Sequence, residues 1–259
     1  MIDAHVHIWR LGRNGCIWPA EEDGMLFRDW SLDDYPGGRV VLVQSQESIL
    51  DTEWLLDVAA HDDRVAAVVG WADLHAPEWI AERPKLVGLR PMVQGREADC
   101  YDDPSLAPGF AAMLDHGLRL DALVRVKHLA SLGRLAARYP QLPIVIDHAG
   151  KPEIGGGFVA WREAIAPLAA LPNMMCKLSG LLTECGDAPA DAVAPYVAEI
   201  LDLFGAERVM WGSDWPVVNA VSSYEAWLAQ AEALVPAAAH EAVFGRTAAR
   251  FYGLAEEAA

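Results

Sequence analysis

IDAHVHI at residues 2–8 and RVMWGS at residues 208–213 are the first and last of a series of short β-rich runs in this sequence. Six further runs lie between them, separated by turn residues or by segments with helical spacing; they begin near Arg39, Val65, Lys85, Arg119, Leu142 and Asn173. Such alternation is typical of parallel strands joined by crossover helices. Eight strands close a (β/α)8 (TIM) barrel of about 250 residues. The sequence therefore predicts an α/β protein in which residues 1–259 form one barrel domain.

Segments between the runs carry apolar residues at three-and-four spacing, which predicts the outer helices of the barrel. They span residues 49–60, 104–117, 129–139, 158–171 and 188–204. Residues 222–252 indicate two extra C-terminal helices that follow the last strand. The first connection, residues 10–38, is long and weakly helical. A loop of that length in a compact barrel is typical of a segment with a functional task.

Twenty Lys and Arg against 37 Asp and Glu give a formal net charge of −17, and 53% of the residues are apolar. Such apolar content predicts a packed core, whereas so negative a surface repels nucleic-acid backbones and anionic lipids, so neither is expected as a partner. The four cysteines form no C-x-x-C pair and are expected to be ordinary thiols. Without a secretory leader pattern or a long apolar run, the sequence predicts a soluble cytoplasmic protein.

Polar residues end several of the β-rich runs, and in such a barrel reactive groups lie at the carboxyl ends of strands. His5 and His7 project to the same side of the first strand if Val6 and Ile8 face the helices. The later runs add further polar residues at or just past their ends: Arg90, His128, His148, Lys177 and Asp214. Burying several ionisable groups together costs stability unless they pair, bind an ion or do chemistry. The set therefore predicts an active site.

Six motifs occur in order from residue 2 to about residue 253. They are Asp3-Ala4-His5-Val6-His7-Ile8-Trp9, Gly88-Leu89-Arg90, Asp147-His148-Ala149-Gly150-Lys151-Pro152, Lys177-Leu178-Ser179-Gly180, Arg208-Val209-Met210-Trp211-Gly212-Ser213-Asp214-Trp215-Pro216 and the tail at residues 244–254. Together they resemble the amidohydrolase superfamily and, within it, the branch of sugar lactonases that includes fuconolactonase-like, rhamnonolactonase-like and pyrone-dicarboxylate lactonase-like enzymes. H-x-H alone is a weak signal, but the ordered set is specific.

The resemblance implies a hydrolase that opens a lactone, most naturally a sugar-acid lactone of carbohydrate catabolism. In that reading Asp214 takes a proton from the attacking water. His5, His7, His148 and Arg90 stabilise the oxyanion. Five further residues are expected to contact the substrate, two of them as flat rings for a sugar face: Trp9, Trp215, His128, Lys151 and Lys177.

His5, His7 and Asp214, with His148 or His128 as a fourth group, have the donor types that hold one Zn²⁺ or another divalent ion. Superfamily members with two metals typically place a Lys or Glu at the end of strand four, where this sequence has Arg90. A cation there argues against a second ion. The sequence permits one ion without requiring it, because the lactonases that it resembles can work without a metal. We expect no required cofactor.

Two other functions fit parts of the pattern. A metal-dependent decarboxylase of an aromatic or unsaturated acid shares the H-x-H start and the strand-eight Asp214. A non-catalytic carbohydrate-binding barrel accounts for the tryptophans but gives the convergent histidines no task. The sequence leaves open which lactone is the substrate and whether the chain forms a homo-oligomer.

Overall fold

The computed structural model describes residues 1–254 and shows one sheet of eight parallel strands in the order β1 to β8. The strands are β1 (Ile2–Val6), β2 (Arg39–Val43), β3 (Val65–Gly70), β4 (Leu86–Leu89), β5 (Arg119–Ala122), β6 (Ile144–Ile146), β7 (Met174–Leu178) and β8 (Val209–Trp211). A parallel bridge between Val6 and Trp215 joins the end of β1 to the segment after β8. The predicted (β/α)8 barrel is confirmed.

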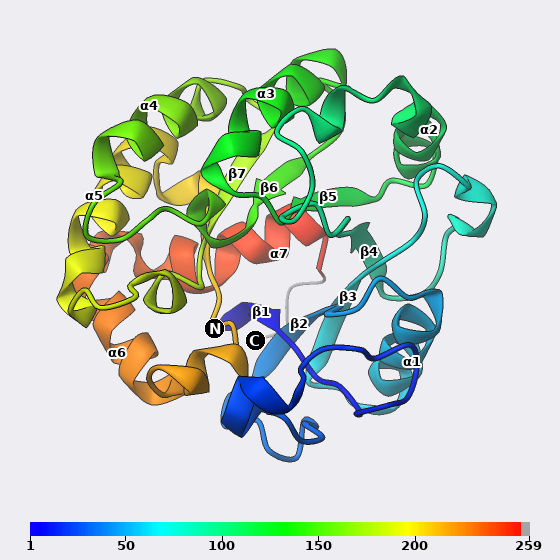
Figure 1. Ribbon diagram of the computed structural model, residues 1–259, viewed down its shortest axis with the longest axis horizontal. Helices are drawn as coiled ribbons and strands as arrows, with labels where there is room; N and C mark the ends of the chain where they lie inside the picture. The colour runs from blue at the N-terminus through cyan, green and yellow to red at the C-terminus, as the bar shows by residue number, and fades with distance from the viewer. Residues whose placement is uncertain (255–259) are drawn as a thin grey trace.

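Helices surround the sheet, and the last helix of the chain lies across the middle in the view of Figure 1. They are α1 (Ile49–His61), α2 (Ala107–Asp115), α3 (Leu129–Arg138), α4 (Phe158–Ala169), α5 (Ala194–Phe204), α6 (Tyr224–Leu234) and α7 (Thr247–Tyr252). The five predicted outer helices and the two extra C-terminal helices are confirmed, with ends shifted by a few residues. Between β3 and β4, the described chain has only a short 3-10 helix, Pro77–Trp79.

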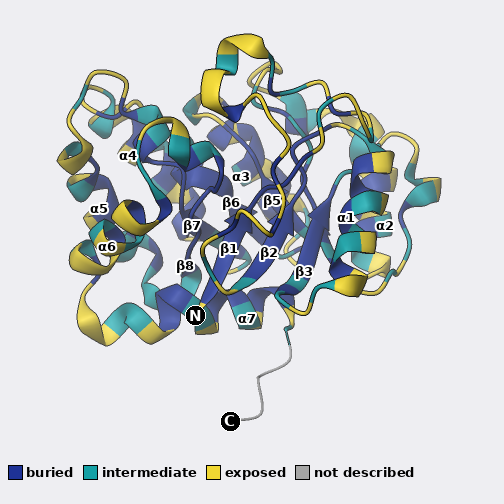
Figure 2. Ribbon diagram, turned by 90° about the horizontal axis from the view of Figure 1, so that it is seen from below, coloured by how far each residue is buried: buried dark blue, intermediate teal, exposed yellow. Residues whose placement is uncertain are grey.

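Apolar side chains form two layers, because successive residues of a strand face opposite sides of the sheet. The larger layer packs between the strands and the outer helices and includes Val6 and Ile8, so these residues face the helices as predicted. The smaller layer fills the barrel interior, and α7 covers it with Ala248, Phe251 and Tyr252. Figure 2 shows buried strands at the centre and α7 at the same end as the N-terminus. One end of the barrel is therefore plugged.

An irregularity in β1 orients the first polar residues of the chain. The pairing register with β2 shifts between Asp3 and Val6. The shift takes the amide of His5 out of the regular ladder, and this amide donates to Asp3 Oδ1 at 3.1 Å. The same carboxylate oxygen accepts the amide of Ser213 at 2.9 Å. Asp3 thus ties the end of β1 to the turn after β8.

The first connection, residues 10–38, contains a 3-10 helix at Glu21–Leu26 and otherwise irregular chain, in agreement with its weak helical pattern. Trp9 pairs with Trp30 in an antiparallel bridge, which folds this connection back onto the barrel. Within residues 1–254, no helix is both long enough and apolar enough to cross a bilayer.

Candidate active site

The carboxyl ends of five strands place polar side chains together at the open end of the barrel. His5 lies in β1 and His7 just after it, Arg90 follows β4, and Asp214 follows β8. The end of β6 contributes Asp147 and His148, and β7 contributes Lys177. Each of these side chains is almost fully buried. The structure therefore brings together the five residues that were predicted to be catalytic: His5, His7, Arg90, His148 and Asp214.

A cavity of about 340 Å³ opens onto this cluster. Its polar wall is formed by His7, Ser45, Arg90, Gln94, His148, Lys151 and Asp214. Its apolar wall is formed by Trp18, Met92, Leu123 and Val217. A larger cavity, of about 490 Å³, lies beside it and shares Met92, but contains none of the clustered residues. The smaller cavity is therefore the candidate active site.

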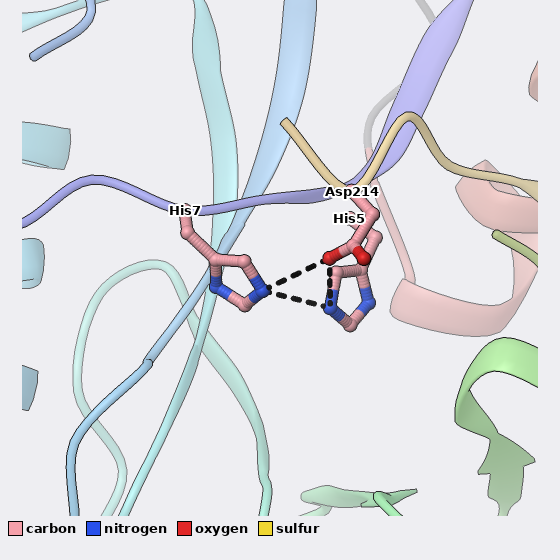
Figure 3. A group of neighbouring side chains, drawn as sticks. All are labelled: His5, His7 and Asp214. Carbon is pink, nitrogen blue, oxygen red and sulfur yellow. Dashed lines mark hydrogen bonds and ion pairs between the residues drawn. The ribbon is translucent and has the colours of Figure 1, made fainter. Parts of the chain in front are cut away.

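His5, His7 and Asp214 form the centre of the cluster, and Figure 3 shows their side chains converging. The Nε2 atoms of His5 and His7 are 3.1 Å apart. Asp214 Oδ1 lies 3.4 Å from His7 Nε2 and 3.8 Å from His5 Nε2. Only His7 and Asp214 line the cavity, whereas His5 is fully buried behind them. His5 therefore contacts the other two residues without lining the cavity itself.

The electrostatic environment keeps Asp214 charged and the histidines neutral. Burial alone would raise the pKa of Asp214, but His148, His7 and His5 hold that pKa well below its ordinary value. Burial lowers the pKa of His148 to about 4 and also lowers the pKa of His7. At neutral pH, an ionised carboxylate therefore faces neutral imidazoles.

Left-handed backbone positions the two groups at the cavity floor. His148 has φ 53° and Asp214 has φ 59°, a region that costs a non-glycine residue free energy. His148 is held by Ser179, whose Oγ lies 2.9 Å from its Nδ1. Gly180 leaves room for this ring, since a Cβ there would lie 2.3 Å from His148 Nδ1. Local strain and close packing therefore fix both side chains.

Arg90 is held from two sides. Its guanidinium donates to the carbonyl oxygen of Gln44, and Gln44 Nε2 donates back to the Arg90 carbonyl at 2.7 Å. Arg90 Nη1 lies 3.5 Å from Asp147 Oδ2 and 3.3 Å from His5 Nε2. The guanidinium thus carries a fixed positive charge to the cavity wall, balanced by a buried carboxylate.

Lys177 lies beneath the cluster, inside the barrel, and its side chain is fully buried. Nζ is 2.5 Å from Asp121 Oδ2 and 3.1 Å from Asp147 Oδ1. These ion pairs, with Arg90 and His5, hold the pKa of Asp147 well below its usual range although burial alone would raise it. Nζ is also 3.1 Å from His5 Nδ1. Tyr252 of α7 donates to Asp121 Oδ2 at 2.7 Å.

Two overlapping groups of side chains lie close enough to hold a metal ion. Ligand atoms of His5, His7 and Asp214 all lie within 4.8 Å of one another, as do those of His5, Asp147 and His148. Tetrahedral Zn²⁺ with bonds of about 2.0–2.1 Å to nitrogen separates its ligand atoms by roughly 3.3 Å. The first group fits that spacing. The chemistry of its donors fits less well, because His5 Nδ1 faces the Lys177 ammonium.

Four of the residues expected to contact the substrate lie away from the cavity. Trp9 is fully buried and donates to Arg28 O, and Trp215 packs against Trp30 and Tyr35. His128 is bonded to the Arg125 amide and to the Arg96 carbonyl oxygen, and Lys177 lies beneath the cluster. The sequence shows which residues lie near the end of a strand, but it does not show whether a side chain reaches the cavity or stays buried in the core. For this reason these four predictions were wrong. Lys151 does line the cavity.

Sequence reasoning assigned no role to several residues that the structure places at the site. Asp121 and Asp147 carry charge into the barrel interior, and a charged residue inside an apolar run, as in RLDALVRV, is the signal that was available. Trp18 lines the cavity, with its backbone held by Gln46: Nε2 donates to Trp18 O at 2.6 Å. Nothing in the sequence distinguishes Trp18 from the other tryptophans.

Comparison with known proteins gives consistent matches along the whole chain. A family model described as amidohydrolase matches residues 2–254. An L-fucono-1,5-lactonase from Burkholderia ambifaria is 44% identical over 274 residues, covering 97% of this chain and 94% of the relative. A second L-fucono-1,5-lactonase, from Burkholderia multivorans, is 37% identical and covers 99% of this chain and 97% of its own.

Among solved structures, an amidohydrolase from Burkholderia multivorans with bound Zn is 35% identical to this chain. It superposes with a TM-score of 0.89 and covers 98% of this chain and 99% of its own.

Proposed function

This chain belongs to the amidohydrolase family, and we propose that it is a lactonase that hydrolyses a sugar-acid lactone in the cavity at the ends of its strands. The observation that carries the proposal is the convergence of Asp214, His148 and Arg90 on one cavity, in a chain that is 44% identical to an L-fucono-1,5-lactonase. These groups supply what acyl transfer to water needs: a proton acceptor and donors for the developing oxyanion.

Asp214 activates the attacking water. Its carboxylate lines the cavity and stays ionised at neutral pH. As the water oxygen bonds to the carbonyl carbon, Asp214 takes the proton that the water releases. The low pKa makes Asp214 a weak base, but it makes the protonated form a strong acid. Protonated Asp214 then returns the proton to the ring oxygen as the ester C–O bond breaks, which leaves a hydroxy acid.

Arg90 and His148 stabilise the negative charge that develops on the carbonyl oxygen. The Arg90 guanidinium is permanently charged and fixed by Gln44 and Asp147. His148 is neutral, and if the Ser179 hydroxyl donates to its Nδ1, the ring proton lies on Nε2, 4.0 Å from Asp214 Oδ1. Preorganised donors of this kind are worth roughly 3 kcal/mol of barrier each. His7 lines the cavity next to Asp214, with its Nε2 3.4 Å from Asp214 Oδ1.

The charge balance of the cavity favours a neutral substrate. Both cationic side chains of its wall already have carboxylate partners: Arg90 faces Asp147 at 3.5 Å, and Lys151 lies 3.2 Å from Glu184. A substrate carboxylate would therefore find no uncompensated positive charge there. Aldonolactones are uncharged and carry hydroxyl groups, which suit Ser45 and Gln94 Oε1, an atom without a hydrogen-bond partner among the described residues.

The same argument weakens the decarboxylase alternative, whose substrate must carry a carboxylate. A panel of aldonolactones that includes L-fucono-1,5-lactone tests the proposal with a pH-indicator assay. We expect release of one acid equivalent per ring opened, with the hydroxy acid as product and no carbon dioxide. Carbon dioxide release from an aromatic acid, with no lactone opened, would overturn the proposal.

A further inference from the structure

The hydrogen bonding around Lys177 determines which nitrogen of His5 carries the proton. An ammonium has three N–H donors and no acceptor. The Lys177 ammonium is enclosed by three groups that can accept: Asp121 Oδ2 at 2.5 Å, Asp147 Oδ1 at 3.1 Å and His5 Nδ1 at 3.1 Å. Since the side chain is fully buried, no solvent replaces any of them. The third N–H therefore points to a lone pair on His5 Nδ1.

The other side of the His5 ring leads to the same proton position. His7 Nδ1 lies 2.7 Å from the carbonyl oxygen of Val43, which can only accept, so His7 carries its proton on Nδ1 and a lone pair on Nε2. His5 Nε2 faces that lone pair at 3.1 Å. An Nε2–H on His5 makes this contact a hydrogen bond, whereas a bare Nε2 would set two lone pairs against each other.

The opposite tautomer has poorer partners. With its proton on Nδ1, His5 would donate to Asp147 Oδ1 over 3.5 Å and would oppose a Lys177 N–H at 3.1 Å. Its one gain would be a bond from Arg90 Nη1 at 3.3 Å, but the charge of Arg90 is already balanced by its ion pair with Asp147 Oδ2 at 3.5 Å. The Nδ1–H tautomer is also the one that a metal ion on His5 Nε2 requires.

We propose that Lys177 is a positioning residue that holds His5 as the Nε2–H tautomer, so that His5 serves as a hydrogen-bond donor to His7 and not as a metal ligand. This role rests on the proposed lactonase function only insofar as it concerns catalysis. The consequence is that the cluster has the spacing of a metal site while its buried lysine disfavours the tautomer that a metal needs.

The wild-type protein provides the first test. The ¹⁵N NMR spectrum of protein labelled in its histidines distinguishes protonated from bare ring nitrogens, and the spectrum of His5→Asn identifies the His5 signals. We expect the proton on Nε2 of His5. A proton on Nδ1 would overturn the proposal, whether or not any lactone is a substrate.

A charge-balanced double variant provides the second test. Lys177→Met with Asp121→Asn removes the ammonium together with one carboxylate, and it leaves Asp147 free to accept from His5 Nδ1. We expect the His5 proton to move to Nδ1 and the Zn²⁺ affinity, measured by calorimetry, to rise by at least about tenfold. With a lactone substrate, kcat should fall while KM stays close to the wild-type value.

Tyr252→Phe is the matched control, because it removes a hydrogen bond to the same Asp121 without touching His5. It should leave the tautomer and the Zn²⁺ affinity unchanged. A folded double variant with wild-type tautomer and Zn²⁺ affinity would overturn the proposal. If the double variant does not fold, the wild-type spectrum decides.

Discussion

At the scale of single residues, the proposed hydrolysis depends on keeping one carboxylate ionised among neutral rings. Asp214 is buried, which disfavours its charge, yet the neighbouring histidines outweigh burial and lower its pKa. The backbone of Asp214 is left-handed, and its amide donates to the carbonyl oxygen of His5 at 2.9 Å. Both features place the carboxylate, and neither depends on its charge.

Asp214→Asn should therefore leave the fold intact and reduce hydrolysis of the lactone by at least about a hundredfold. The amide keeps the shape of the side chain but cannot accept the proton of the attacking water. Initial rates from the pH-indicator assay and a circular dichroism melt measure the two effects. Near-normal turnover in a folded variant would remove Asp214 from the mechanism.

Asp51 offers a test of burial at a residue outside the chemistry. It lies in the first turn of α1, is fully buried, and its pKa is raised by burial from 3.8 to about 7. Between these two pH values the folded protein keeps a proton that the unfolded chain has lost, so this group lowers stability as pH rises and its effect levels off above about 7.

Asp51→Asn removes that pH dependence. The free energy of unfolding of the variant, relative to wild type, should rise by roughly 3 kcal/mol between pH 5 and pH 8. Urea unfolding of both proteins at the two pH values measures the change. A difference that is the same at both pH values would show that Asp51 is ionised in the folded protein throughout.

At the scale of elements, the segments after the strands carry the site, and Gly180 after β7 shows how closely they pack. Gly180→Ala should reduce activity on the order of a hundredfold, because the new Cβ would overlap His148 Nδ1 and displace the ring. Gly186→Ala is the matched control: φ is +53° there, similar to +61° at Gly180, but no atom lies within 4 Å of the added Cβ.

Both glycine variants should lose about 1 kcal/mol to backbone strain. Only Gly180→Ala should lose activity, which separates displacement of His148 from general destabilisation. Thermal melts and steady-state rates of the two variants provide the comparison. Equal activity in both would mean that the His148 ring tolerates the shift.

The helices and strands could be predicted from sequence because each has apolar residues at a regular spacing, which follows from burying one face of the element. Residues 49–60 read as a helix and form α1 over Ile49–His61, and the eight β-rich runs all form strands. Whether a particular side chain is buried in the core or lines the cavity does not follow from any regular spacing in the sequence. Trp9 ends the first motif and Trp18 follows nine residues later in the first connection, yet Trp9 is buried and Trp18 lines the cavity. Only the folded path of residues 10–38 decides between them.

At the scale of the whole molecule, a series of hydrogen bonds and ion pairs links the plugged end of the barrel to its open end. Tyr252 of α7 bonds to Asp121, Asp121 pairs with Lys177, and Lys177 reaches His5 behind the cavity. Inside an apolar barrel such a chain is stable only because each charge has a partner. The sequence shows that the strands contain charged residues, but which of them pair can be seen only in the closed barrel.

Prolonged chelator treatment should leave most of the lactonase activity, with metal analysis confirming removal. The reasons are the fixed charge of Arg90 at the cavity wall and the contact of Lys177 with His5 Nδ1. An ester within a ring also opens more readily than an amide, so a few preorganised donors can suffice. Loss of activity on metal removal and its return with Zn²⁺ would make His5, His7 and Asp214 ligands and would require another proton acceptor, with His148 the next candidate.

Part of the cavity wall comes from segments that lie beyond the strand ends, and this origin bears on how such an enzyme diversifies. Trp18 comes from the first connection, Met92 and Gln94 follow β4, and Val217 follows β8. These positions lie outside the strands, where exchange or lengthening of a segment leaves barrel closure untouched. Substitutions in these segments can therefore reshape the cavity while the buried ion pairs of the barrel interior stay in place.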